Sequence, residues 1–276
     1  MRKRRLSAST RFIFSKKSTN IHNGYELDKV FGIKYRDTFA NKILYLIYCM
    51  LEYKKFRVIS KPVIRLLNLA GVTVINENNN YNFQPGILQP RKGLTFYAGG
   101  WHSEKYFREV RDEVLHCFQF DLSQVGATNL EILKDIRSRS SVSVHVRRGD
   151  FLDSNNYQKY GAVCTLNYFV CAIGKMKELV DAPHFFFFTN DYPWVRENFT
   201  GEDVTIVNIN AGADSWKDMF LISNCQHHID SNGSFSWWSS YLNKDERKRV
   251  IVPKNFVNNE YFGDIYPENW IQLSDY

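Results

Sequence analysis

Two adjacent arginines follow a strand-like stretch near the middle of the chain. Residues 141–146 read SVSVHV, an alternation typical of a buried strand. The polar side chains at its end are His145, Arg147, Arg148 and Asp150. Open α/β sheets bind their ligands at the carboxyl ends of strands, and the arginine guanidinium is a fork of fixed donors that suits phosphate. The pattern therefore indicates a site for an anionic ligand; the alternative is a surface cluster of ion pairs.

Two further segments place polar residues after predicted strands. In HHIDSNGSFSWW, residues 227–238, Asn232 lies in a turn, and Ser234 and Ser236 begin a predicted helix. Backbone N–H groups and the helix dipole make such a turn a good anion site, although serines are also ordinary helix caps. In FFFFTND, residues 185–191, Asp191 could accept a hydrogen bond from a ribose or a base, or cap the next helix.

Motifs of other nucleotide and metal sites are missing from the sequence. It contains no GxGxxG fingerprint, no P-loop and no DxD pair. The His227-His228 pair has no second ligand cluster at zinc spacing. We therefore expect a site that works without a metal.

The predicted elements after residue 140 follow the order of an α/β protein with a parallel sheet. Strands expected at 141–146, 185–188, 204–209, 228–229 and 250–252 alternate with helices expected at 168–179, 194–199, 214–225 and 234–242. Earlier patterns predict a helix over 41–70, a strand at 72–75, and helices over 103–120 and 128–138. The apolar residues of 41–70, which include Val63, Ile64, Leu66 and Leu67, are typical of a core helix.

Composition is that of a globular protein. The 276 residues, 44% hydrophobic and 24% charged, suffice for one large domain or two of ordinary size. The 5 cysteines are odd in number and form no CxxC pair, which favours a reducing compartment over a disulfide framework.

The net charge of +7 resides in a basic arm. Residues 1–17 contain seven Lys and Arg and no acid, and the remaining Lys and Arg equal the 29 Asp and Glu in number. A neutral body argues against binding to nucleic acid, whereas the arm could contact an anionic membrane surface or remain a solvated tail. No apolar signal region follows the MRKRR start, and the apolar run 43–51 is too short to span a bilayer. We expect a cytoplasmic protein, with any membrane contact peripheral at the inner face.

These segments together resemble the signature blocks of glycosyltransferase family 11, the bacterial-type α-1,2-fucosyltransferases, which are distantly similar to α-1,6- and protein-O-fucosyltransferases. The blocks are HNGYELDKVFGI (22–33), GGWHSEKYF (99–107), HVRRGD (145–150), YGAVCT (160–165), FFFFTND (185–191), the run 214–243 and PENWIQL (267–273). The resemblance covers roughly residues 18–276 and depends most on HVRRGD followed by SFSWW.

The resemblance implies an α/β fold of the GT-B type, in which two Rossmann-like domains face a cleft. It implies metal-independent, inverting transfer of L-fucose from GDP-β-L-fucose to a hydroxyl of a galactose-terminated surface glycan. The chain then divides into the basic arm 1–17, an acceptor-side α/β domain 18–138 and a GDP-fucose-binding domain 139–276.

The resemblance also implies roles for individual side chains. Arg147 would hold the diphosphate with support from Arg148 and His145, and Asp150 would orient an arginine. Ser234 and Ser236 would lie near the nucleotide phosphates and Asp191 near the guanosine side. Asn232 is a further candidate for donor binding.

The sequence departs from the family pattern in two places. Family members open with a strand and a GGLGNQ-type glycine loop that lines the cleft, and MRKRRLSASTRFIF stands there instead, so we expect an incomplete first domain. An alternative function is therefore a catalytically weak or inactive protein that still binds a GDP-sugar. Gly233 and Asp230 replace a serine and an apolar residue. Candidates for the general base, by side-chain type alone, are Glu104, His102 and Asp153; the alternatives are a base in the absent glycine-loop segment and loss of the proton to water.

Overall fold

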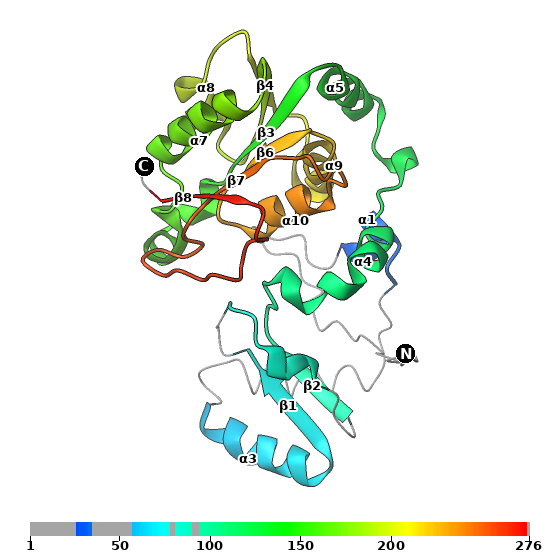
Figure 1. The fold of residues 1–276 in the computed structure, drawn as a ribbon. Coiled ribbons are helices and arrows are strands. Elements are labelled where there is room, and N and C mark those ends of the chain that lie inside the picture. The colour runs from blue at the N-terminus through cyan, green and yellow to red at the C-terminus, as the bar shows by residue number, and fades with distance from the viewer. Residues whose placement is uncertain (1–25, 35–56, 78–80, 90–93, 275–276) are drawn as a thin grey trace. The chain divides into compact units, whose positions relative to one another are not determined.

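The computed structural model describes residues 26–34, 57–77, 81–89 and 94–274, which belong to two compact units (Figure 1). The first unit comprises residues 1–80 and 84–100, and the second comprises 81–83 and 101–276. Residues 101–138, assigned to the first domain by the sequence analysis, lie in the second unit. The basic arm 1–17 is outside the described residues.

The first unit contains a parallel pair of strands with a helix packed against it. Helix α3 (Arg57–Leu69) leads into β1 (Val72–Asn76), which pairs in parallel with β2 (Leu94–Ala98). Between α3 and β1, Gly71 has a φ of 78°, in the left-handed region that favours glycine, and this allows the tight turn from helix to strand. The unit also holds α1 (Leu27–Phe31) and the 3₁₀ turn η2 (Pro85–Leu88).

Helix α3 is the described part of the core helix predicted over 41–70, of which residues 41–56 lie outside the described residues, and it is only partly buried. Val63, Ile64 and Leu67 are half-buried, but Leu66 is 66% exposed and Leu69 is 80% exposed. The prediction that Leu66 would be buried is therefore wrong. Apolar residues surround more of this helix than one packing surface can cover, so their spacing could not show which of them face the strands.

The second unit contains a six-stranded parallel sheet in the order β5-β4-β3-β6-β7-β8. Its strands are β3 (Ser140–Val146), β4 (Pro183–Thr189), β5 (Val204–Val207), β6 (His227–Ile229), β7 (Val250–Pro253) and β8 (Ile271–Leu273). The predicted α/β class with a parallel sheet is confirmed. Strand β8 was not among the strands predicted from the sequence.

Helices cover both faces of this sheet (Figure 1). They are α5 (Ala127–Ser138), α7 (Leu166–Leu179), α8 (Tyr192–Asn198), α9 (Trp216–Ser223) and α10 (Ser234–Leu242). The core joins the valines of β3 and Phe185 and Phe187 of β4 to residues of α7, which include Tyr168, Phe169 and Met176. Because β3 and β4 are buried on both faces, β4 appears in the sequence as an uninterrupted aromatic run.

The segment before α5 is less regular than the sequence predicted. Instead of one helix over 103–120 it forms the 3₁₀ turns η3 (Glu104–Tyr106) and η4 (Arg108–Val110), then α4 (Arg111–Cys117). Tertiary contacts hold this irregular path, because Lys105 pairs with Asp264 at 2.6 Å and Phe107 stacks on Trp238. The remaining short elements are η5 (Leu122–Gln124), η6 (Gly149–Phe151), α6 (Ser154–Asn156), the π-helical turn η7 (Tyr157–Gly161) and η8 (Gly212–Asp214). None of the described helices has both the length and the apolar composition needed to cross a membrane.

Candidate functional site

The sheet has a topological switch point between β3 and β6, where successive connections lead to opposite sides. From β3 the chain moves outward to β4 and β5, and then returns to β6 on the other side of β3 before continuing to β7 and β8. At such a switch point a crevice opens beyond the carboxyl ends of the two neighbouring strands, and open α/β sheets bind ligands there. Arg147 follows β3 and the loop 230–233 follows β6, so the structure brings two of the predicted ligand segments to this point.

Asp150 holds Arg147 in a fixed orientation. The Nε and Nη2 atoms of Arg147 donate to the two carboxylate oxygens at 3.1 and 2.7 Å, and the guanidinium lies over the Phe151 ring, 4.9 Å from its centroid. The Arg147 backbone N–H donates to Ser231 Oγ at 3.1 Å and so ties the end of β3 to the end of β6. Within the described part of the chain Nη1 has no protein partner, which leaves it to meet a ligand.

Arg148 points toward the end of β4 and pairs with Asp191. Its Nε donates to Asp191 Oδ2 at 3.0 Å, and its Cζ lies 4.0 Å from the centroid of the Trp194 ring. Asp191 also caps α8, because Oδ1 accepts from the Trp194 N–H at 3.3 Å. Asp191 therefore both anchors Arg148 and caps the N-terminus of α8.

Asn190 fixes the backbone of the arginine loop, defined as residues 147–150. Its Oδ1 accepts from the N–H groups of Arg148 and Gly149 at 2.9 and 3.2 Å. A Cβ atom on Gly149 would come within 2.8 Å of Asn190 Nδ2, so glycine is needed for this close approach. The ends of β3 and β4 are thus joined through one side chain.

Asn232 anchors the loop that follows β6. This side chain is buried, and its Nδ2 donates to the carbonyl oxygens of Tyr160 and Phe256 at 3.1 and 3.0 Å. The predicted role of Asn232 in donor binding stays a prediction, and the contacts that the structure supplies for it are internal to the protein.

The start of α10 is open on the side of Arg147. Gly233 precedes the helix with an extended backbone and supplies no capping side chain. Arg147 Cδ lies 3.9 Å from the position that a Cβ on Gly233 would occupy, and Ser234 at the first helical position is exposed. Because the first turn of a helix has free N–H groups and the positive end of the dipole, this position favours an anion.

His145 and Ser236 form a buried pair behind the arginine loop. His145 Nδ1 lies 2.6 Å from Ser236 Oγ, and the His145 carbonyl accepts from the Ser231 hydroxyl. Burial, together with the nearby charge of Arg147, lowers the pKa of His145 to about 3, so the imidazole is neutral at pH 7. Contact of the His145 or Ser236 side chain with a donor stays a prediction.

Asp230, which replaces an apolar residue of the family pattern, is a buried acid at the end of β6. Its Oδ1 accepts from Ser240 Oγ at 2.8 Å, and its carbonyl accepts from the Tyr168 hydroxyl at 2.7 Å. Burial raises the pKa of Asp230 well above its ordinary value, because the charged carboxylate is disfavoured away from water. The hydrogen bond from Ser240 offsets part of the cost of burying this side chain.

Four residues of this site were not among those predicted from the sequence. Asn190 and Ser231 hold the two loops, and Phe151 and Trp194 lie beneath the guanidinium groups. Asn190 and Ser231 could have been found, because each is a polar residue directly after a predicted strand. The aromatic partners could not, since stacking depends on how the loops fold.

The candidate bases and the metal prediction remain without a direct test. Glu104 is buried and accepts from Arg108 Nη2 at 2.9 Å, the His102 ring lies 4.5 Å from that of Tyr81, and Asp153 is exposed before α6. Across the described ranges no three His, Cys, Asp or Glu side chains gather in a way that could hold a metal ion. Metal independence stays a prediction.

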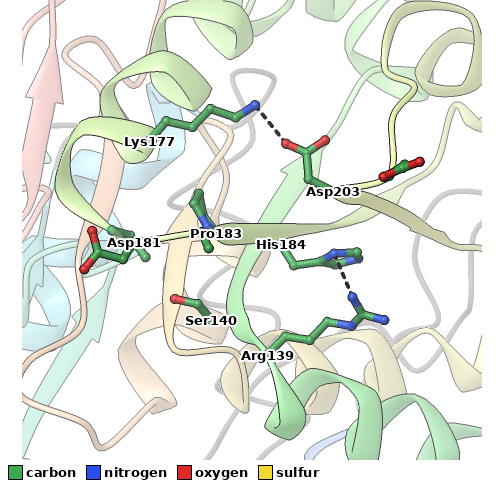
Figure 2. Close-up of a pocket in the computed structure, with 10 residues that line it drawn as sticks. Arg139, Ser140, Lys177, Asp181, Pro183, His184 and Asp203 are labelled. Atoms are coloured by element: carbon green, nitrogen blue, oxygen red, sulfur yellow. Dashed lines mark hydrogen bonds and ion pairs between the residues drawn. The ribbon is translucent and has the colours of Figure 1, made fainter.

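A surface hollow lies at the other end of the sheet (Figure 2). It is lined by residues at the amino ends of β3 and β4, among them Arg139, Ser140 and His184. Two of its charged groups, Lys177 and Asp203, pair at 2.8 Å. Because it lies at the amino ends of the strands, the hollow is separate from the carboxyl-end site.

Comparisons with known proteins agree on a family. The profile described as glycosyl transferase family 11 matches residues 87–274. An α-1,2-colitosyltransferase of Escherichia coli is 28% identical over 268 residues, which are 93% of this chain and 86% of that protein. The O-antigen biosynthesis glycosyltransferase WbnK of Escherichia coli is 28% identical over 67% of this chain and 63% of its own length.

Human galactoside α-(1,2)-fucosyltransferase 1 is 35% identical over 162 residues, which are 56% of this chain and 44% of the human protein. Among solved structures, fucosyltransferase NodZ from Bradyrhizobium aligns with a TM-score of 0.43 and 16% identity, over 80% of this chain and 69% of that one.

Proposed function

Because this chain belongs to glycosyl transferase family 11, we propose that it transfers L-fucose from GDP-β-L-fucose to a galactoside hydroxyl of a surface glycan, with inversion at the anomeric carbon. The observation that carries the proposal is the meeting of Arg147 with the open first turn of α10 at the β3–β6 switch point. This is where a sheet of this order binds a nucleotide, and the donors there suit a diphosphate. The fucosyl, colitosyl and O-antigen names of the relatives support a deoxysugar donor and a surface-glycan acceptor.

An inverting transfer needs hydrogen-bond donors that stabilise the leaving group. The acceptor oxygen attacks C1 of the sugar while the bond from C1 to the phosphate oxygen breaks, and the acceptor proton passes to water or to a base. Positive charge builds on the sugar ring and negative charge on the departing GDP. Arg147 Nη1 and the N–H groups around Ser234 would stabilise that negative charge without a metal, because they are already oriented.

Asp150 and Asp191 hold the two arginines in position before a ligand binds. Each of the pairs Arg147–Asp150 and Arg148–Asp191 is neutral overall, so the site offers oriented hydrogen-bond donors more than net charge. Side chains held by a partner and by an aromatic ring lose less freedom when a ligand binds. We assign the diphosphate to Arg147 and the guanosine side to the region of Arg148 and Asp191.

Two measurements test the proposal. Calorimetry with GDP reports the nucleotide site, and mass spectrometry of lactose incubated with GDP-β-L-fucose reports transfer. A second donor, GDP-colitose, is included because the α-1,2-colitosyltransferase matches 93% of this chain. Absence of GDP binding at millimolar concentration by the folded protein would contradict the site. Binding without transfer of either sugar would favour the inactive GDP-sugar-binding alternative.

A further inference from the structure

One face of α3 is exposed although it is rich in apolar residues. Its exposed side chains include Lys61, Pro62, Arg65, Leu66 and Leu69, with the polar Asn68 beside them. They recur at spacings of three and four residues, so they lie next to one another on the helix surface. Leu69 at 80% and Leu66 at 66% are the two most exposed large apolar side chains in the described ranges. Two strongly exposed leucines are therefore neighbours on one helix of the first unit.

The same face carries positive charge without compensation. Residues 57–71 contain three Lys and Arg and no Asp or Glu. Neither Lys61 nor Arg65 has an ion-pair partner in the part of the chain that the structure describes. Lys61, Arg65 and Leu69 follow one another at intervals of four residues, so the cations and the leucines border on each other.

We propose that this face of α3 docks on an anionic phospholipid bilayer. Leu66 and Leu69 would enter the boundary between headgroups and acyl chains, and Lys61 and Arg65 would contact lipid phosphates. An amphipathic helix that joins basic and leucine-rich surface binds membranes in this way, through buried apolar area and attraction to anionic lipid together. The positive charge of this face favours lipid over a second copy of the chain as its partner, because two such faces in contact would place unpaired cations opposite each other.

The inference is independent of the nucleotide site. Helix α3 belongs to the first unit and lies outside residues 87–274, which match the family profile. Docking through α3 would place the protein at a membrane surface whether or not it transfers a sugar. The two proposals can therefore fail separately.

Co-sedimentation with vesicles tests the docking face on the full chain. The probes are vesicles of phosphatidylcholine alone and vesicles in which part of it is replaced by phosphatidylglycerol, at low and high salt. We expect binding to the anionic vesicles alone. Lys61→Gln with Arg65→Gln should weaken that binding by about 25-fold, at roughly fivefold per cation, and should reduce its salt dependence. Leu66→Gln with Leu69→Gln should weaken it by at least about tenfold.

Matched controls separate α3 from general charge and hydrophobicity. Leu122→Gln and Lys244→Gln alter an exposed leucine and an exposed lysine of the second unit, and the basic arm is unchanged in every variant. Both controls should bind like the parent chain.

Three results would overturn the proposal. The first is equal binding to neutral and anionic vesicles, or α3 variants that bind like the parent. The second is a dimer in light scattering that the leucine variants dissociate, which would make a second copy the occupant. The third is a melting temperature lowered by many degrees in the leucine variants, because this would show that Leu66 and Leu69 are buried in solution. GDP affinity should stay the same in all variants.

Discussion

Replacing Arg147 with lysine should weaken GDP binding while leaving the fold intact. Lysine has one nitrogen in place of the guanidinium fork, so it cannot bond to both Asp150 oxygens and still direct a donor at a phosphate. A hydrogen bond to a charged group contributes about 1.5–3 kcal/mol, and about 1.4 kcal/mol corresponds to a factor of ten. We expect GDP affinity to fall by roughly ten- to a hundredfold.

The effect of Arg147→Lys on stability should be smaller than its effect on binding. The side chains of Arg147 and Asp150 are 23% and 13% exposed, and ion pairs in contact with solvent contribute about 1 kcal/mol or less. For a protein of this size that corresponds to a decrease in melting temperature of about 2–4 °C. Calorimetry with GDP and a thermal melt measure the two effects, and Arg196→Lys, an exposed arginine of α8, is the control.

Arg148→Lys provides the test that could refute this assignment. The variant loses the Nε contact with Asp191 and the stacking on Trp194, which contributes about 0.5–2 kcal/mol. We therefore expect it to reduce stability more than GDP affinity. If Arg147→Lys binds GDP normally and Arg148→Lys does not, the two arginines have been assigned the wrong way round.

The site and its surroundings predict four other outcomes. Gly149→Ala should weaken GDP binding, because its Cβ would displace the Asn190 side chain from two N–H groups; Gly174→Ala, with open space around it, is the control in the same calorimetry. Burial lowers the pKa of His145 to about 3, from about 6.5 when unfolded, so its contribution to stability is full above pH 6.5 and is lost as the pH falls toward 3. The melting temperature of His145→Asn should therefore fall less than that of the parent in this window. Asp218 lies on α9 and accepts from Asn210 Nδ2 at 2.7 Å. Burial raises the pKa of Asp218 to about 7, so the dependence on pH has the opposite sign: its contribution to stability is full below about pH 3.8 and is lost as the pH rises through 7. Asp218→Asn should thus gain melting temperature relative to the parent between pH 4 and pH 8, by a few degrees, and a constant difference would argue that the acid is exposed in solution. Excess EDTA should leave GDP binding and transfer unchanged, and recovery of activity on adding Mn²⁺ would show that the site needs a metal.

The elements around the site could be predicted from the sequence because burial leaves a local pattern. Strands β3 to β7 and helices α5, α7, α9 and α10 each bury one or two faces, so apolar residues recur at fixed spacings within a few positions. The order of strands and helices then predicted a parallel sheet, and the blocks HVRRGD and SFSWW predicted the family. The polar residues at strand ends predicted where a ligand would bind, because all strands of a parallel sheet end at the same edge.

Only the tertiary structure decided which side chains meet at that edge. Arg147 pairs with Asp150, three residues away, but Arg148 pairs with Asp191 at a separation of 43 residues, and Ser231 reaches Arg147 across 84. Strand order and register bring these loops together, and neither can be predicted from the spacing of neighbouring residues. For the same reason the apolar composition of this helix could not show that Leu66 is exposed whereas Leu67 is half-buried.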